Sequence, residues 1–124
     1  MPFPYGWGRR CKLTIDHLEV SENQSNFPWL LHHDNLPSEM FDADGLHPAL
    51  NGGGDVRFSS DRYGYNRLSI EVKTFITDNN PDNGVAEIWV KIPSVSTSID
   101  TDIWVWYNKS GESQPARDAA SGGV

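Results

Sequence analysis

The sequence predicts an all-β protein: an antiparallel β-sandwich with jelly-roll-like or Greek-key connections and one short helical turn. Several segments alternate apolar and polar residues with a period of two, which places the apolar side chains on one face of a strand. Turn-forming clusters separate these segments, and the chain holds 11 glycines and 8 prolines among its 124 residues. Because almost no segment carries a helical period, the core must form where one sheet packs on another.

The length and charge of the chain limit its organisation and its partners. With 124 residues it is expected to form one domain around a single core. Its formal net charge of −7 argues against nucleic acid and against membranes as partners, since both are bound through Lys and Arg. No apolar run approaches the roughly 20 residues needed to span a bilayer, and no apolar segment precedes the first arginines. We therefore expect no leader peptide, and the single cysteine, Cys11, allows no internal disulfide.

Four strands are expected before the tryptophan-rich part of the chain, at residues 10–16, 27–33, 55–59 and 68–75. Each alternates apolar with polar residues or contains β-favouring side chains. Pro28, near the start of the second strand, favours an edge position because proline cannot donate a ladder hydrogen bond. Residues 38–45 are expected to form the helical turn, capped by Ser38 and ended by Gly45.

Residues 85–107 form two further predicted strands and contain three of the five tryptophans. In the first of these strands, four aliphatic residues share one face and Trp89 lies on the other. In the second, Trp104 and Trp106 lie opposite a face of apolar residues. Pro93 is expected to end the first strand, and the long return after it means that the two strands need not be neighbours.

Both ends of the chain differ from the middle in composition. Residues 1–108 are expected to form the sandwich domain, and the small, polar residues 109–124 a flexible tail or linker. Near the N-terminus, Phe3, Tyr5 and Trp7 alternate along a proline-containing segment. We expect this segment to lie across the sandwich or against a neighbouring molecule.

Aromatic side chains are the candidates for contact with a partner or a glycan, since they combine a large apolar area with a polar edge. Three interpretations of the tryptophan faces remain open: a buried core, a protein interface, or a platform for sugar rings. The candidate contact residues are Trp104, Trp106, Trp89, Phe3, Tyr5 and Trp7.

Charged side chains give fewer candidates. Arg57 lies in an otherwise apolar segment and is expected to form a structural ion pair with Glu71, for which Arg10 is a second possible partner. No nucleophile–base motif and no selected carboxylate pair is present, so no catalytic residue is expected. Turn formation explains the Asp-rich residues 42–45 and 78–82, and in residues 32–34 alternation leaves only the first and third side chains on one face. Neither a metal nor a cofactor is therefore expected.

Several short motifs occur in an order that resembles a known family. They are Trp7 followed by Arg9-Arg10, Leu13-Thr14-Ile15-Asp16, Asn26-Phe27-Pro28, Gly54-Asp55-Val56-Arg57-Phe58, Leu68 with Glu71, Trp89-Val90-Lys91-Ile92-Pro93, and Val105-Trp106-Tyr107-Asn108. From Trp7 to Asn108 the chain resembles an uncharacterised domain family, a domain of unknown function. Its members often precede concanavalin A-like or laminin-G-like lectin domains in microbial surface proteins and phage virion proteins. The resemblance implies a β-sandwich and carries no known catalytic residues.

These observations lead to two expectations about function. The first is a non-catalytic phage virion module, a capsid decoration or a tail- or fibre-associated protein, which is made in the host cytoplasm and resides in the virion. It would bind other virion subunits and copies of itself. The alternative is a glycan-binding module of a surface adhesin or of a carbohydrate-processing protein, with the tryptophans as its platform. Neither expectation makes the chain an enzyme.

Overall fold

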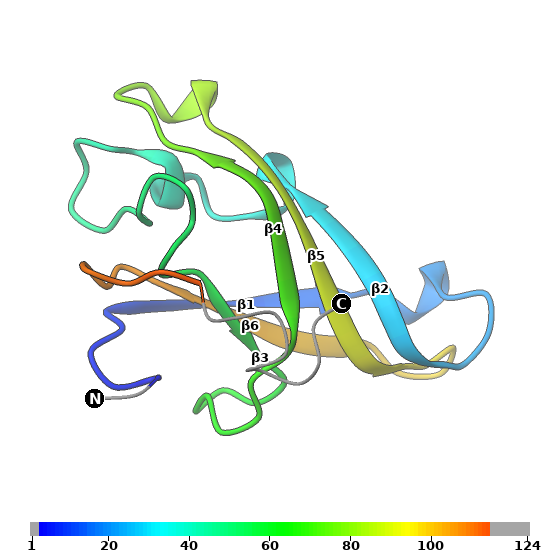
Figure 1. The fold of residues 1–124 in the computed structure, drawn as a ribbon. Helices are drawn as coiled ribbons and strands as arrows, with labels where there is room; N and C mark the ends of the chain where they lie inside the picture. Colours follow the sequence, from blue (N-terminus) through cyan, green and yellow to red (C-terminus); the bar gives the residue numbers. More distant parts are fainter. Residues whose placement is uncertain (1–2, 115–124) are drawn as a thin grey trace.

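The protein is an all-β antiparallel sandwich of two three-stranded sheets, as the sequence predicts. We describe it from a computed structural model, which places residues 3–114 (Figure 1). Six strands were expected and six are present in this part of the chain, each within a few residues of its predicted position. The strands are β1 (Arg9–Ile15), β2 (Gln24–His32), β3 (Arg57–Ser59), β4 (Ile70–Ile76), β5 (Val85–Val95) and β6 (Thr101–Tyr107).

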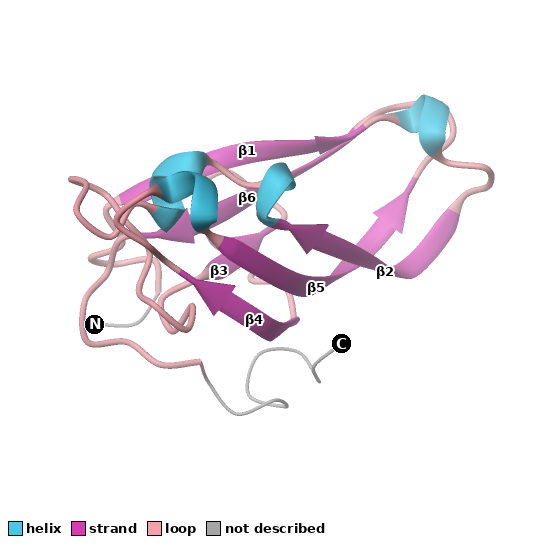
Figure 2. Ribbon diagram, turned by 90° about the horizontal axis from the view of Figure 1, so that it is seen from above, coloured by secondary structure: helices cyan, strands magenta, loops and turns pink. Residues whose placement is uncertain are grey.

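The pairing of the strands is nested, as in a jelly roll. One sheet has the order β1-β6-β3 and is called the β6 sheet here; the other has the order β2-β5-β4 and is called the β5 sheet. Strand β1 pairs with β6 and strand β2 pairs with β5, both antiparallel. The segment from β1 to β2 therefore runs antiparallel to the segment from β5 to β6. Figure 2 shows the two layers, with β1, β6 and β3 in one and β2, β5 and β4 in the other. The two tryptophan-bearing strands, β5 and β6, therefore lie in different sheets.

Helical structure is confined to single 3-10 turns in the connections. The turn predicted from residue 38 is present as η3 (Ser38–Phe41), but it follows Pro37, has no side-chain cap and ends before Gly45. The proposed cap at Ser38 is therefore wrong. Three turns were missed: η1 (His17–Glu19), η2 (His33–Asn35) and η4 (Pro81–Asn83). Each of these three begins after a residue whose side chain accepts a hydrogen bond from a backbone N–H. A turn of three residues is too short to show the apolar period by which helices are recognised in a sequence. Between residues 3 and 114, no helix has the length and apolar character to cross a membrane.

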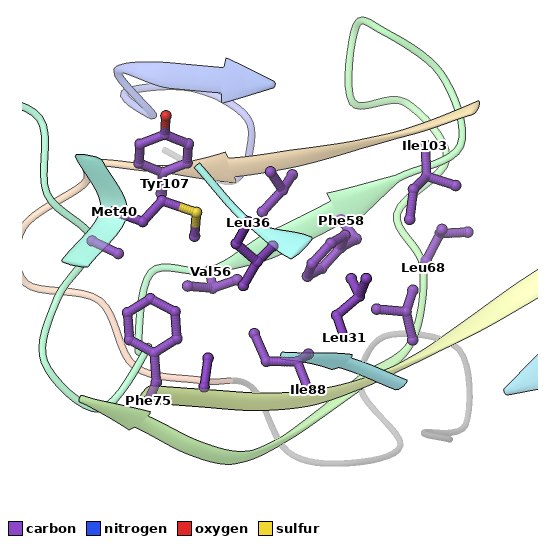
Figure 3. Close-up of a cluster of buried hydrophobic side chains, with 14 of the residues drawn as sticks. Leu31, Leu36, Met40, Val56, Phe58, Leu68, Phe75, Ile88, Ile103 and Tyr107 are labelled. Atoms are coloured by element: carbon purple, nitrogen blue, oxygen red, sulfur yellow. The ribbon is translucent and has the colours of Figure 1, made fainter. Parts of the chain in front are cut away.

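The core lies between the sheets and follows the predicted alternation. On β5, Ile88, Val90 and Ile92 have no exposed surface, and on β6 Val105 has none. Phe58 of the short strand β3 is equally buried and stands in the middle of the cluster in Figure 3. Burial of each such side chain stabilises the fold by about 1.5–3 kcal/mol. The inward faces of β5 and β6 are thus structural.

β5 does not end at Pro93, as predicted, but continues to Val95. Strand β2 pairs with it over this stretch, in the register Ser25 with Ser94. The ladder between β4 and β5 reaches only to Val90, so at Pro93 strand β5 has a paired neighbour on one side alone. Proline lacks a backbone N–H, and it is tolerated at this point because no second strand among residues 3–114 is present to accept a hydrogen bond from that side of β5. Pro28 occupies a true edge strand, β2, as expected.

A buried carboxylate joins segments that are distant in sequence. Asp55 has no exposed surface, and its Oδ1 accepts the N–H of Leu50 at 2.9 Å. Its Oδ2 accepts the N–H groups of Asn108 and Lys109 at 2.8 and 3.0 Å. Its backbone carbonyl accepts the indole N–H of Trp7 at 2.6 Å. One residue thus fixes the N-terminal segment, the loop before β3 and the chain that leaves β6.

The chain after β6 is held to the sandwich, which moves the predicted domain boundary. The Ser113 carbonyl accepts a hydrogen bond from the Arg57 guanidinium at 2.9 Å. The side-chain amide of Gln114 donates to the carbonyls of Gly53 and Val56 at 2.8 and 2.7 Å. Residues 109–114 therefore belong to the folded unit, and the rest of the predicted tail, residues 115–124, lies outside the described residues.

We predict that Asp55→Ala lowers the free energy of unfolding by about 3 kcal/mol or more, because it leaves buried backbone N–H donors without an acceptor. Chemical denaturation followed by tryptophan fluorescence measures this change. Asp44→Ala is the control: Asp44 is exposed, and its replacement should change stability by less than about 0.5 kcal/mol. A loss below about 1 kcal/mol for Asp55→Ala would contradict the assigned role.

Candidate functional site

Three of the predicted contact residues pack together on the outer face of the β6 sheet. The ring of Phe3 packs edge-on against Trp7 and against Trp106, at centroid distances of 5.1 and 5.3 Å. Trp106 retains 7% of its surface, and its indole N–H donates to the Ser59 hydroxyl at 2.8 Å. The N-terminal segment therefore lies across the outer face of the β6 sheet, one of the two expected positions. For Trp106, the prediction of contact with a partner is corrected, because the chain itself covers this ring.

The remaining predicted aromatic residues are separate from this cluster. Trp104 is half-buried and lines a pocket of about 330 Å³ together with Arg10, Lys12 and Arg62. Tyr5 is 65% exposed. Trp89, also half-buried, lies on the other sheet, opposite Leu30 of β2 and Glu71 of β4. The structure therefore does not assemble one platform from the three tryptophans of β5 and β6.

The predicted ion pair between Arg57 and Glu71 is wrong. Arg57 lies in the β6 sheet and its guanidinium is 3.6 Å from Glu112, whereas Glu71 lies in the β5 sheet and is 3.0 Å from Lys73. The Arg57 guanidinium also stands over the ring of Trp7, 5.4 Å from the centroid. Burial lowers the pKa of Arg57 below its usual range. Sequence distance hid the true partner, because Glu112 falls in the segment predicted to be a flexible tail.

A buried phenol–carboxylate pair ties η3 to β6. The Tyr107 hydroxyl donates to Glu39, which also accepts from Arg9 at 3.0 Å. Burial, and then the Glu39 carboxylate, raise the pKa of Tyr107. Burial alone would raise the pKa of Glu39, but the hydrogen bonds from Tyr107 and Arg9 outweigh it and lower that pKa. Because the Tyr107 side chain lies in the core, this pair anchors η3 to the sandwich.

A loop that sequence reasoning passed over as polar carries the most prominent aromatic surface of the described chain. It connects β3 to β4 and is the green loop at the bottom of Figure 1; we call residues 60–66 the tyrosine loop. Tyr63 is 54% exposed and Tyr65 is 81% exposed, and their ring centroids are 5.9 Å apart. The sequence did contain a signal for this surface: Tyr63 and Tyr65 stand in a cluster of turn-forming residues, and a turn does not itself require aromatic side chains.

The backbone of the tyrosine loop is organised around one carboxylate. Asp61 accepts the N–H groups of Tyr63 and Tyr65 through Oδ2 at 3.2 and 3.0 Å, and that of Asn66 through Oδ1 at 2.8 Å. Burial acts to raise the pKa of Asp61, but these N–H donors outweigh it and hold the pKa below its ordinary value. The loop's conformation is therefore linked to the ionisation of Asp61.

Contacts outside the loop fix its position on the sandwich. The Ser59 hydroxyl donates to the Asp61 carbonyl at 2.6 Å, and Arg10 donates to the Arg62 carbonyl at 2.6 Å. Gly64 is buried with a φ of +80°, and a Cβ atom there would lie 3.2 Å from the Phe3 ring. The N-terminal segment, the outer face of the β6 sheet and the tyrosine loop therefore form one packed unit.

Beside the tyrosine loop lies a larger pocket of about 720 Å³. Tyr65, Asn66 and Arg67 line it from the loop and the residues after it, and Asn26 and Lys91 line it from β2 and β5. The pocket is an open groove rather than an enclosed cavity. A site of this kind offers an aromatic face, amide groups that both donate and accept hydrogen bonds, and two cations.

Two clusters place metal-ligating atoms close together, but no further observation points to an ion at either. In His32, His33 and Asp34 the atoms lie within 4.8 Å of one another. Strand alternation predicted that His33 points away from His32 and Asp34 and so cannot share a ligand with them. This prediction is wrong, because β2 ends at His32 and the chain turns into η2. The second cluster is Asp16, His17 and Asp100, in which the Asp100 carboxylate accepts from His17 at 2.6 Å.

Together, the two sheets and the tyrosine loop define a small β-sandwich with an exposed aromatic pair. Comparison with known protein families matches residues 52–122 to a domain of unknown function, DUF2341. The chain belongs to this family. The match covers the later motifs of the resemblance, from Gly52 onward, and includes the whole tyrosine loop. No curated protein and no solved structure matches the chain.

We predict that the tyrosine loop loosens as the pH falls below about 4, before the sandwich unfolds. Asp61 has a lowered pKa in the folded state, so its stabilising effect is present above the unfolded pKa of about 3.9 and is lost as the pH falls through the folded value. Hydrogen exchange of the Tyr63, Tyr65 and Asn66 amides should accelerate at low pH and also, at neutral pH, in Asp61→Ala. Equal protection of these amides in Asp61→Ala and in the natural chain would show that the carboxylate does not hold the loop.

Proposed function

We propose that the protein is a non-catalytic carbohydrate-binding module whose site is the tyrosine loop and the groove beside it. The observation that carries this proposal is the pair Tyr63 and Tyr65, which a loop hydrogen-bonded to Asp61 holds in solvent next to an open groove. Exposed rings cost solubility and favour self-association, so a loop built to present two of them is best explained by a ligand.

The chemistry of the groove fits a sugar polymer. The face of an aromatic ring packs against the apolar C–H face of a sugar, and Tyr65 is free to offer such a face. Asn26 and Asn66 provide amide groups that can both donate to and accept from hydroxyl groups. Because the groove is open to solvent, a sugar polymer bound there can extend beyond it.

The composition of the groove favours binding without chemistry. Among the described residues, those that line it include no Asp, Glu, His or Cys. Glycoside hydrolysis ordinarily requires two carboxyl groups on either side of the scissile bond. A bound sugar would therefore be held and not cleaved.

We predict that Tyr65→Ala weakens carbohydrate binding about tenfold or more, because the exposed ring supplies the central apolar contact. Affinity electrophoresis and isothermal titration against a panel of polysaccharides measure the effect. Leu46→Ala is the control: Leu46 is a well-exposed side chain in the connection between η3 and β3, and its truncation should leave binding unchanged. No binding to any glycan, or an equal loss in both variants, would overturn the proposal.

A second candidate function is the expected structural role in a phage virion, for which an apolar tip is the favouring observation. Leu18, in η1, is 81% exposed, and Ile99, in the β5–β6 connection, is 69% exposed. The bond between His17 and Asp100 joins these two connections, which lie together at the right of Figure 1, away from the tyrosine loop. Such a tip suits contact with a protein subunit.

For this second candidate, we predict that the chain co-purifies with phage particles or forms a defined oligomer. The variant Leu18→Ser/Ile99→Ser should lose that association while its unfolding transition is unchanged, since both side chains are exposed. Leu46→Ser is the control, because Leu46 is 89% exposed in a different connection. A chain that is monomeric and absent from particles would exclude the virion role.

A further inference from the structure

We propose that the ligand of this site is an acidic carbohydrate, a polymer with carboxylate or sulfate groups, and that the pocket at Trp104 binds one of those groups. This inference rests on the proposed carbohydrate-binding function and assigns its substrate class. It comes from the distribution of positive charge over the surface of an acidic protein.

The positively charged side chains of residues 3–114 fall into two sets. Those of the first set each lie within 3.6 Å of a carboxylate: Arg9 with Glu39, Arg57 and Lys109 with Glu112, and Lys73 with Glu71. The second set takes part in no ion pair among residues 3–114, and all of its members line one of the two pockets beside the loop. Its members are Arg10, Lys12, Arg62, Arg67 and Lys91.

This division is unexpected in a chain with a net charge of −7, which has carboxylates in excess. Asp61, the carboxylate within the loop, is occupied by backbone N–H groups. Asp102, on β6, accepts the Thr14 hydroxyl at 2.8 Å. The cations that line the two pockets are therefore able to pair with a ligand, and electrostatic complementarity to an anion requires such unpaired positive charge.

The pocket at Trp104 has a geometry suited to a carboxylate or a sulfate. Lys12 lies directly across from Trp104 in the β1–β6 register, and Arg10 and Arg62 complete the lining. The guanidinium of Arg10 stands over the Trp106 ring at 5.6 Å from the centroid, and that of Arg62 stands over Tyr63 at 5.4 Å. Guanidinium groups held in this way lose less freedom on binding and can donate two parallel hydrogen bonds to one anion.

Residues of the tyrosine loop line both pockets, so one polymer chain can contact the two. Tyr65 lines the larger groove with Arg67 and Lys91, while Arg62 of the same loop lines the smaller pocket. A chain of acidic sugars that crosses the loop would meet a ring face and then cations in turn. A nucleic acid has a higher density of charge, and its affinity depends on release of counterions by a basic protein, which the net charge of −7 opposes.

The test uses acidic polymers and the same polymers without their charge. Polygalacturonate, alginate and hyaluronan are each compared with their carboxyl-reduced counterpart, and heparin with its desulfated form, by isothermal titration with the full chain. We expect at least one acidic polymer to bind about tenfold or more tightly than its neutral counterpart, and its affinity to fall as NaCl rises from about 0.05 to 0.5 M.

Charge-neutralising variants locate the effect. Arg62→Gln and Lys12→Gln should each weaken the acidic polymer about fivefold and leave affinity for a neutral counterpart unchanged. Lys73→Gln, which removes an exposed cation that is already paired with Glu71, is the control and should have no effect. Circular dichroism confirms that each variant is folded.

The outcomes separate this inference from the proposed function. If neutral and acidic polymers bind equally well, or if Arg62→Gln and Lys12→Gln bind normally, the acidic class is wrong and carbohydrate binding stands. If no polymer of either kind binds, both fail. If a single-stranded oligonucleotide binds and none of the acidic polymers does, the cation cluster serves nucleic acid and the inference is overturned.

Discussion

The carboxylate of Asp55 has to be satisfied inside the protein, and the way it is satisfied determines how the two ends of the chain are placed. A buried carboxylate without partners costs several kcal/mol, so the fold is stable only when donors converge on it. They come from the loop before β3 and from the two residues that follow β6. The carbonyl of the same residue holds the Trp7 indole, so closure of the N-terminal segment over the β6 sheet depends on the same position.

From this point a continuous series of contacts reaches the candidate site. Trp7 packs against Phe3, Phe3 against Trp106, and the Trp106 indole donates to Ser59, whose hydroxyl donates to the Asp61 carbonyl. Phe3 and Trp7 therefore connect the outer face of the β6 sheet to the tyrosine loop through this series of contacts.

The features predicted correctly from the sequence are those encoded by neighbouring residues. Alternation and β-favouring side chains located all six strands, and the long return after Pro93 indicated that β5 and β6 need not be neighbours, which agrees with their places in different sheets. The errors concern long-range pairing. Whether Trp106 is exposed depends on Phe3, about a hundred positions earlier, and the partner of Arg57 lies in a segment without any periodicity. Hydrogen bonds to Asp61 gave the tyrosine loop its order, and no pattern of hydrophobicity records such bonds.

The separation of paired and unpaired cations has a physical effect that extends beyond the pockets. Five cations without ion-pair partners among residues 3–114 line the pockets beside one loop of a chain with a net charge of −7, and an uneven distribution of charge of this kind gives a protein an electric dipole moment. In the field of an acidic surface, a dipole experiences a torque that turns its positive end forward, while the net charge still opposes close approach. Encounters would thus be rare but already oriented, and both their frequency and their orientation would depend on the ionic strength of the medium.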